Sequence, residues 1–564
     1  MTANNARKVL IIGGVAGGMS AATRLRRLDE NAEITILERG EHVSFANCGL
    51  PYYAGGVIEE RDALLLQTPK SLKSRFNLDV LVQHDAVKID RERKEVTANT
   101  PEGEKTFEYD QLILAPGAKP FVPPMPGAER GLTLRNVADV DAIMAQVQTK
   151  PKTAALLGAG FIGLELAENL HKRGIEVTLV EAAPQILAPL DDEMAAMVEN
   201  HLIDQGIKVV TNDQATEITE DAVVLKSGKQ VPAEMVIIAV GVRPDTNIAK
   251  DAGLETDQRG GIVVDESQRT SDPDIFAVGD AVVKRDRIDG APVHIPLANS
   301  ANRDGRAVAD IIVGLAPSNG DGQVRKTAGV LGTAVVGVLG LTVAATGWNE
   351  RKAKANGREV ATIHTHPFNH ATYYPGAEKL ALKLVYDPKT LEILGAQAVG
   401  GAGADKRIDV IATAIAGGLL ATDLAGIDLA YAPQFGSAKD PITMLGFVAD
   451  NLASGVTSSV DIHDLAQKQA DGHLVLDVRT VGEFERGNIP QAVNVPLDDL
   501  RDRIDEVREL ANGKEIVVHC AVGVRGHTAV QILKAHDLAA TNLDGGYTSW
   551  SAWQRKQERD AQQA

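Results

Sequence analysis

The stretch TAALLGAGFIGLELAENLHKRGIEVTLVE, residues 153–181, decides the fold of a large part of this chain. An apolar run reaches the glycine-rich turn GAGFIG, a helical pattern follows, and a second apolar run ends at Glu181. This order predicts a βαβ unit of a parallel sheet. The same order occurs near the start of the chain, where KVLIIGG and EITILE flank a helical pattern. The chain is therefore predicted to be an α/β protein with two Rossmann-like domains.

The turn GAGFIG has the glycine spacing of a dinucleotide-binding loop, with Gly158, Gly160 and Gly163 in place. Such glycines let the backbone approach a pyrophosphate, and the following helix supplies N–H groups and a positive dipole end. An acid at the end of the next strand binds the ribose hydroxyls and repels a 2′-phosphate. Glu181 occupies that position, which predicts NADH rather than NADPH.

The first turn, GGVAGG, is less regular, because Val15 stands where the pattern has its second glycine. The glycines that must then form the turn are Gly13, Gly14, Gly17 and Gly18. Glu38 again ends the following strand, and a later segment, DIFAVGD, ends at Asp280. Two such units predict that one site holds FAD and the other NADH.

Composition narrows the class of protein. The 564 residues carry a formal net charge of −18, which disfavours nucleic acid as a partner. No apolar run reaches the roughly 18 residues of a membrane span, and the nearest, residues 327–346, is typical of buried strands. The N-terminus has no signal-peptide pattern. Two lone cysteines suit a reducing compartment, so a cytoplasmic protein with reactive thiols is expected.

Cys48 lies in SFANCGLPYY, where Pro51 suits the first turn of a helix. A helix start favours a thiolate, and the thiolate is the nucleophilic form of cysteine. Because no second cysteine is near, Cys48 is predicted to form a mixed disulfide, a persulfide or a sulfenate rather than a local disulfide.

Cys520 follows the strand EIVVHC and opens the loop 520–525, which ends at Arg525 before a helix. Successive N–H groups of such a loop can point at one sulfur, and Arg525 adds positive charge. Both features favour a thiolate or persulfide at Cys520. His364 and His366, in HTHPFNH, suggest a metal site, but no neighbouring ligand completes a set, and none is predicted.

These motifs resemble the flavin-dependent pyridine nucleotide–disulfide oxidoreductases. SFANCGLPYY, GAGFIGLE and DIFAVGD occur in the family's order within residues 6–447, and the single-cysteine branch, with coenzyme A-disulfide reductases and NADH oxidases and peroxidases, is most similar. DVRTVGEFERGNIPQAVNVP, CAVGVRG and LDGGYTSW are similar to a rhodanese. The whole arrangement resembles fusions of a CoA-disulfide reductase with a rhodanese, a group that includes NADH-dependent persulfide reductases.

The resemblance implies a homodimer whose active site is completed across the two subunits. It implies four domains and a linker: an FAD domain at 1–150 and 245–325, an NAD domain at 151–244, an α+β dimerisation domain at 326–447, a linker at 448–460 and a rhodanese domain at 461–564.

The resemblance also places the FAD and NADH contacts at the two turns and at nearby strand ends. The implied cofactor residues are Gly13, Gly14, Ala16, Gly17, Gly18, Glu38, Arg39, Ala115, Gly117, Gly158, Gly160, Ile162, Gly163, Glu181, Gly241, Asp280 and Ala298.

The substrate side of the resemblance is coenzyme A. The implied CoA contacts are Arg24, Arg27, Ser44 and Asn47, with the two arginines on one face of a helix. Tyr373 and Tyr431 match two tyrosines that the partner subunit contributes, where a phenol can donate a proton to a leaving thiolate. Tyr374 adjoins Tyr373, and the match stays open between them.

In the rhodanese part, Asp477 and Arg479 match the residues that support the loop of Cys520. The resulting hypothesis is an NADH-dependent reductase of CoA persulfide, polysulfide or CoA disulfide. Cys48 attacks sulfur and Cys520 carries sulfane sulfur.

Three other functions remain open. An NADH peroxidase or oxidase would cycle Cys48 through a sulfenate, although Ala16 stands where the peroxidases carry a histidine. A sulfurtransferase with a regulatory flavin part would not need Cys48. A redox sensor would bind nucleotide and a partner without steady turnover.

Overall fold

The structure is a computed structural model that describes residues 6–315 and 327–563. The chain forms two compact units, one of residues 1–182 and 213–332 and the other of residues 183–212 and 333–564. Helix α6 (Asp192–Asp204) therefore belongs to the second unit, although the sequence places it inside the predicted NAD domain.

The first βαβ unit builds a five-stranded parallel sheet in the order β17-β7-β1-β2-β3. Its strands are β1 (Lys8–Ile12), β2 (Glu33–Glu38), β3 (Asp79–Val82), β7 (Gln111–Leu114) and β17 (Ile275–Ala277). Helices α1 (Ala16–Leu28) and α8 (Ala298–Ile312) contribute to the core on this sheet. The glycine turn thus sits at the carboxyl end of β1, where ligands bind in such sheets.

The second βαβ unit joins β9 (Thr153–Leu157), α5 (Phe161–Lys172), β10 (Glu176–Val180) and β15 (Met235–Ile238). Both neighbours of β9, namely β10 and β15, run parallel to it. Leu157 pairs with Val180 in the register. That register brings Glu181 beside the turn that follows β9, as the NADH prediction requires.

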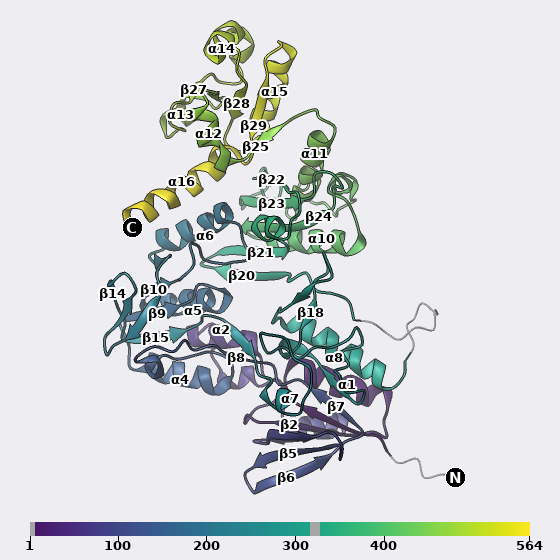
Figure 1. Cartoon of the computed structure of the whole chain (residues 1–564). Coiled ribbons are helices and arrows are strands. Elements are labelled where there is room, and N and C mark those ends of the chain that lie inside the picture. Colours follow the sequence, from purple (N-terminus) through teal and green to yellow (C-terminus); the bar gives the residue numbers. More distant parts are fainter. Residues whose placement is uncertain (1–5, 316–326, 564) are drawn as a thin grey trace. The chain divides into compact units, whose positions relative to one another are not determined.

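Smaller elements complete the first unit (Figure 1). Its antiparallel strands are β4 (Asp85–Asp90), β5 (Glu95–Thr100), β6 (Gly103–Glu108), β8 (Ala118–Pro120), β12 (Ala215–Ile218), β13 (Ala222–Leu225), β14 (Gln230–Pro232), β16 (Val242–Pro244), β18 (Lys284–Arg285) and β19 (Pro292–Val293). Its other helices are α2 (Leu50–Gly55), α3 (Pro69–Phe76), α4 (Val137–Gln148) and α7 (Asn247–Asp251), with 3-10 turns at η1 (Asn47–Gly49), η2 (Arg61–Leu64), η3 (Ala128–Arg130) and η4 (Gly279–Ala281).

In the second unit, an antiparallel sheet follows the order β20-β21-β24-β23-β22. Its strands are β20 (Ala334–Val338), β21 (Leu341–Gly347), β22 (Ala361–Thr365), β23 (Leu380–Tyr386) and β24 (Ile393–Gly400), with α9 (Glu350–Ala355), α10 (Ala404–Gly417), η5 (Ala421–Gly426) and α11 (Pro441–Ala453) between or after them in the chain. The short β11 (Lys208–Val210) follows α6 in the chain and is not a strand of this sheet. Every residue of β23 and β24 is buried. Helices α10 and α11 share the hydrophobic core of this sheet, and α6 also contacts β24.

The C-terminal module has a parallel sheet in the order β25-β29-β28-β26-β27. Its elements are β25 (Ser459–Val460), η6 (Ile462–Asp464), α12 (Leu465–Ala470), β26 (Leu474–Asp477), α13 (Val481–Glu485), β27 (Val493–Asn494), η7 (Leu500–Arg503), α14 (Ile504–Ala511), β28 (Ile516–His519), α15 (Val524–Ala535), β29 (Ala540–Leu543) and α16 (Gly546–Gln563). Figure 1 shows α16, in yellow, beside α6, and the two helices are in contact.

Two expectations about local structure can be compared with these bounds. The apolar run at 327–346 contains strands β20 and β21, as expected. The predicted linker 448–460 is wrong in part, because α11 extends to Ala453 and β25 begins at Ser459. The helix continues because Leu445 and Ala449 face the core of the sheet. None of the helices in the described residues combines the length and the hydropathy that crossing a membrane requires.

Candidate active sites

The first glycine turn is shaped for close backbone approach. Gly13 has φ +101°, and a Cβ there would lie 2.1 Å from the carbonyl oxygen of Ala115. A Cβ on Gly18 would lie 2.0 Å from the carbonyl oxygen of Gly13, so the first turn of α1 packs directly against the backbone of the glycine turn. The N–H groups of Gly14 and Gly40 each donate to the Glu38 carboxylate at 2.8 Å. The acid therefore lies at the turn, as ribose recognition requires.

The second turn repeats this geometry. A Cβ on Gly163 would lie 2.0 Å from the carbonyl oxygen of Gly158, whereas a Cβ on Gly160 would meet no atom within 4 Å. The Ala159 N–H donates to Glu181 at 2.8 Å. Open space over Gly160, next to the first turn of α5, fits a pyrophosphate. Both turns thus have the cradle and the acid of a dinucleotide site.

Two other predicted cofactor residues have partners that the sequence did not suggest. Arg39 forms an ion pair with Asp245 at 2.6 Å. Asp280, in η4, accepts a hydrogen bond from Arg135 at 2.9 Å. The remaining predicted positions lie at element ends, namely Ala16 and Gly17 at the start of α1, Ala115 and Gly117 after β7, Ile162 in α5, Gly241 before β16 and Ala298 at the start of α8.

Cys48 is exposed and lies in the 3-10 turn η1, directly before the six-residue helix α2. Partial burial and the nearby Glu165 carboxylate raise the pKa of this thiol, and the Arg135 guanidinium opposes them. Burial is the largest of the causes that raise this pKa, and the effect of the start of α2 on the thiolate stays a prediction.

Glu165 is the residue near Cys48 that sequence reasoning missed. It stands in α5, and burial raises its pKa to about 7. The Tyr52 hydroxyl donates a hydrogen bond to Glu165 at 3.4 Å. Burial, together with the Glu165 charge, raises the pKa of Tyr52 to about 12. The signal for this group was present in GAGFIGLE, as an acid two residues after the turn.

The predicted CoA contacts have different neighbours, and their role toward CoA stays a prediction. Arg24 donates to Asp310 of α8 at 2.6 Å, and the side chain of Asp310 is buried. The Arg27 guanidinium lies 5.2 Å from the centre of the Phe76 ring. Ser44 has φ +50° and its N–H donates to the carbonyl of Gly14, while Asn47 begins η1.

Two tyrosines of the second unit meet each other. The hydroxyls of Tyr373 and Tyr431 are 2.8 Å apart, although the residues are 74% and 48% exposed. Tyr374 instead places its ring against His370, with centroids 5.7 Å apart. Tyr373 is thus the one of the two that contacts Tyr431, and its catalytic role stays a prediction.

Cys520 lies at the carboxyl end of the central strand β28 and is fully buried. The Gly523 N–H donates to its Sγ at 3.2 Å, and Gly523 has φ +95°. Arg525 lies at the same loop and interacts with the Cys520 sulfur, while its guanidinium makes two bonds of 2.7 and 2.8 Å to Glu483. Arg525 in turn holds the pKa of the Glu483 carboxyl at about 2. The loop thus has the N–H and the cation that stabilise a sulfur anion.

A buried ion pair supports this loop. Arg479 and Asp477 are joined by hydrogen bonds of 2.6 to 3.0 Å, and Tyr547 lies over the guanidinium at 4.0 Å. The Tyr547 N–H donates to the carbonyl of Cys520 at 2.9 Å. The sequence pointed to the ion pair but missed Tyr547 and Glu483, which lie far along the chain from Cys520.

The two histidines of HTHPFNH have separate partners. His364 lies between Glu193 and Asp544, at 2.9 and 2.6 Å, and its pKa is raised to about 10 because these carboxylates outweigh burial. His366 bonds to the hydroxyl of Ser549 at 2.8 Å. The pair therefore does not converge on a common ligand.

Comparison with known proteins identifies the chain. The family model described as "Pyridine nucleotide-disulphide oxidoreductase" matches residues 7–305, more than half of the sequence. The chain belongs to this oxidoreductase family. Two further models match the oxidoreductase, the dimerisation domain of the same family at residues 333–440 and a "Rhodanese-like domain" at residues 461–552. The flavin and pyridine nucleotide of the family fit the two glycine cradles.

Some relatives of the oxidoreductase match only its reductase part, and others match nearly the whole chain. A coenzyme A disulfide reductase from Staphylococcus haemolyticus is 33% identical over 456 residues, which is 79% of this chain and all of that protein. The crystal structure of reduced Bacillus anthracis CoADR-RHD is 44% identical with a TM-score of 0.94, covering 98% of this chain and 99% of that one. A NAD-dependent persulfide reductase from A. fulgidus is 37% identical with a TM-score of 0.89, covering 96% of this chain and all of that one.

Proposed function

We propose that this oxidoreductase reduces CoA persulfide or polysulfide with NADH, with Cys48 as the nucleophile and Cys520 as a carrier of sulfane sulfur. One observation carries the proposal. The chain joins a single-cysteine reductase to a rhodanese-like loop in which Gly523 and Arg525 are placed to stabilise sulfur on Cys520. The similarity to both a CoA disulfide reductase and a persulfide reductase supports the same substrate class.

The choice of nicotinamide follows from Glu181. Its carboxylate lies at the second turn, where it binds ribose hydroxyls and repels a 2′-phosphate. The proposed donor is therefore NADH. When bound, FAD supplies the transfer of two electrons from NADH to sulfur. The residues that would hold it are those of the first turn, with Glu38 at its ribose and Asp280 beyond the turn.

The proposed reaction at Cys48 has two steps, attack on sulfur and reduction of the sulfur left on the cysteine. The Cys48 thiolate attacks a sulfur of the persulfide, so that the S–S bond breaks and either CoA thiolate or hydrosulfide leaves. Two electrons and a proton then release the sulfur left on Cys48 and restore the thiolate. Overall, CoA persulfide, NADH and one proton give CoA, hydrogen sulfide and NAD⁺. Glu165 controls how readily Cys48 becomes a thiolate, because its charge raises the pKa of the thiol.

The second subunit has a proposed role in this step. The hydrogen-bonded hydroxyls of Tyr373 and Tyr431 are exposed on one subunit. In the proposed homodimer they face the Cys48 of the partner and donate a proton to the leaving thiolate. Exposed phenols are expected on a surface that a partner later covers.

The test follows NADH oxidation and sulfide release without oxygen. The substrates are CoA persulfide, CoA disulfide and inorganic polysulfide, and the proteins are wild type, Cys48→Ser and Cys520→Ser. We expect Cys48→Ser to abolish turnover and persulfide to outpace disulfide. Equal or faster turnover with CoA disulfide would contradict the substrate assignment.

Two additions to this experiment separate the other functions, namely hydrogen peroxide as a further substrate and an assay of sulfur transfer to a thiol acceptor. A peroxide-dependent NADH rate that rivals the persulfide rate would indicate a peroxidase. Sulfur transfer that survives in Cys48→Ser would indicate a sulfurtransferase whose flavin part is regulatory. A wild type without steady turnover on any sulfur acceptor would indicate a redox sensor.

A further inference from the structure

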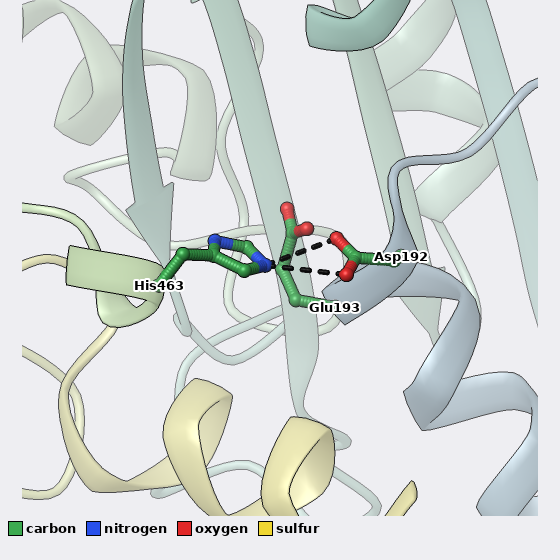
Figure 2. Close-up of side chains that lie close together, drawn as sticks. All are labelled: Asp192, Glu193 and His463. Atoms are coloured by element: carbon green, nitrogen blue, oxygen red, sulfur yellow. Dashed lines mark hydrogen bonds and ion pairs between the residues drawn. The ribbon is translucent and has the colours of Figure 1, made fainter. Parts of the chain in front are cut away.

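Three potential metal ligands meet where α6 contacts the C-terminal module, all within the second unit. Asp192 and Glu193 begin α6, and His463 lies in η6. One ligand atom of each residue lies within 4.8 Å of the others. Figure 2 shows the His463 ring pointing at Asp192, with the Glu193 carboxylate beside the line between them.

The orientation of His463 is that of a metal-ligating histidine. Its Nδ1 lies 2.5 Å from a carboxylate oxygen of Asp461. Its Nε2 lies 3.1 and 3.3 Å from the two carboxylate oxygens of Asp192. A carboxylate on one ring nitrogen fixes the tautomer and orients the other nitrogen for ligation. Here that other nitrogen is hydrogen-bonded to Asp192, so an ion bound there would replace the proton between them.

The acids also have the supporting contacts of a metal site. The Trp553 indole N–H donates to Asp192 at 3.1 Å, which fixes the carboxylate. Glu193 is only 1% exposed, and its Oε1 accepts bonds from Lys383 at 2.6 Å and from His364 at 2.9 Å. The positive end of the α6 dipole favours both carboxylates in their charged form.

One atom of this group has no partner. Glu193 Oε2 is buried, and within the described part of the chain no hydrogen-bond donor reaches it. A buried carboxylate oxygen without a donor costs free energy. The nearby Asp192 is also an acceptor when ionised and cannot supply the donor. A bound cation, a buried water or a proton shared by the two acids would satisfy this oxygen, and the cation also accounts for the convergence of His463 and Asp192 on it.

The geometry points to a zinc ion held by His463 Nε2, an Asp192 oxygen and Glu193 Oε2, with water completing the coordination. Zinc binds nitrogen and oxygen at about 2.0–2.2 Å, so two ligands at a tetrahedral angle are roughly 3.4 Å apart. The His463 to Asp192 separations of 3.1 and 3.3 Å match this spacing. The side chains of His463 and Asp192 are 34% and 44% exposed, which gives the ion a path from solvent. The ion would fasten the rhodanese-like module to α6.

The test uses full-length, FAD-loaded protein that has been treated with chelator, in a Cys48→Ser/Cys520→Ser background that removes both thiols. Zinc binding is measured by calorimetry and by metal analysis after dialysis. We expect about one zinc per chain, with more than about tenfold weaker binding in His463→Gln and Asp192→Asn. His473→Gln is the matched control, because His473 lies in the same module and its ring bonds to the backbone carbonyl of Glu515 rather than to a carboxylate.

Two further measurements protect the test from a variant that fails to fold. Co²⁺ should quench tryptophan fluorescence in wild type and in His473→Gln, because the Trp553 ring lies 5.0 Å from the His463 ring. Anomalous diffraction at the zinc edge should place the ion between the three ligands. Equal binding in His463→Gln, or an ion elsewhere in the crystal, overturns the proposal. Absence of zinc binding in wild type favours the shared proton or a buried water and also overturns it.

Discussion

At the scale of the residue, the reactivity of Cys48 depends on the charges around it. Burial raises the pKa of the thiol, and so do the Glu165 and Asp280 carboxylates, whereas the Arg135 guanidinium lowers it. Arg135 also pairs with Asp280, which reduces the net charge that both present to the sulfur. Glu165 is the group whose charge changes near neutral pH, because its own pKa is about 7. Cys48 should therefore respond to the state of Glu165.

We expect Glu165→Gln to lower the pKa of Cys48, since the substitution removes a negative charge and keeps the shape. The measurement is the rate of alkylation of Cys48 by iodoacetamide as a function of pH, in the Cys520→Ser background. Glu176→Gln, at the exposed start of β10, is the control. An unchanged alkylation profile in Glu165→Gln would show that Glu165 does not act on the thiol.

Glu165 also predicts a pH dependence of stability. Burial raises the pKa of Glu165 in the folded chain to about 7, from 4.5 for an ordinary glutamate, so the unfolded chain loses this proton first. The folded state is therefore penalised progressively as pH rises from about 4.5 to 7, and the penalty is constant above that. Thermal unfolding should show Glu165→Gln gaining stability over wild type between pH 5 and pH 8, with no gain near pH 4. A gain that is independent of pH would contradict this account.

At the scale of the element, each glycine turn joins a strand to a helix, and its glycines have different structural roles. Gly163 lies in α5 against the backbone of Gly158, whereas Gly160 faces open space. The first is needed for helix and strand to approach, and the second for a ligand to approach. A glycine-to-alanine substitution at each position separates the role in ligand binding from the role in packing.

We expect Gly160→Ala to leave the unfolding temperature within about 1 °C of wild type while NADH binding weakens at least about tenfold. Gly163→Ala should lower the unfolding temperature by more than about 2 °C, because its Cβ would lie 2.0 Å from a carbonyl oxygen. Scanning fluorimetry and NADH titration measure both effects. Loss of stability in Gly160→Ala, or normal NADH binding there, would contradict the separation of roles.

At the scale of the whole molecule, buried charges join segments that are distant in sequence. Lys383, in β23, is fully buried and forms ion pairs with Asp191, Glu193 and Glu350 at 3.0, 2.6 and 2.8 Å. Burial alone would lower the pKa of this lysine, but the three carboxylates raise it well above its usual value. The cluster ties α6 and its N-cap to the antiparallel sheet.

We expect Lys383→Met to destabilise the second unit by about 3–5 kcal/mol, because it leaves buried carboxylates without their cation. The measurement is thermal unfolding of the holoenzyme, with Lys389→Met as the control, since Lys389 and Glu359 form an exposed pair. The control should unfold like wild type. If Lys383→Met also unfolds like wild type, the cluster does not contribute to stability.

Contacts between residues close together in the chain could be predicted from the sequence, and contacts between distant residues could not. Gly158, Gly163 and Glu181 belong to one βαβ unit, and their arrangement follows from local pattern. Arg24 is the contrary case, because its helix face gave no sign of its ion pair with Asp310 of α8, which is 286 residues away. Glu165 stands in the motif GAGFIGLE, but no local pattern places it near Cys48, and the same holds for Glu483 and Cys520.

The sequence by itself determined the two dinucleotide turns, the loops of Cys48 and Cys520, the family and the order of its parts. Those features are short, and their chemistry lies in contiguous residues whose backbone geometry depends on local glycines and apolar periodicity. Only the tertiary structure decided the charge environment of Cys48, the pairing of Tyr373 with Tyr431 and the meeting of Asp192 and Glu193 with His463. Asp192 and His463 are 271 residues apart, and only the packing of α6 against the C-terminal module brings them within bonding distance.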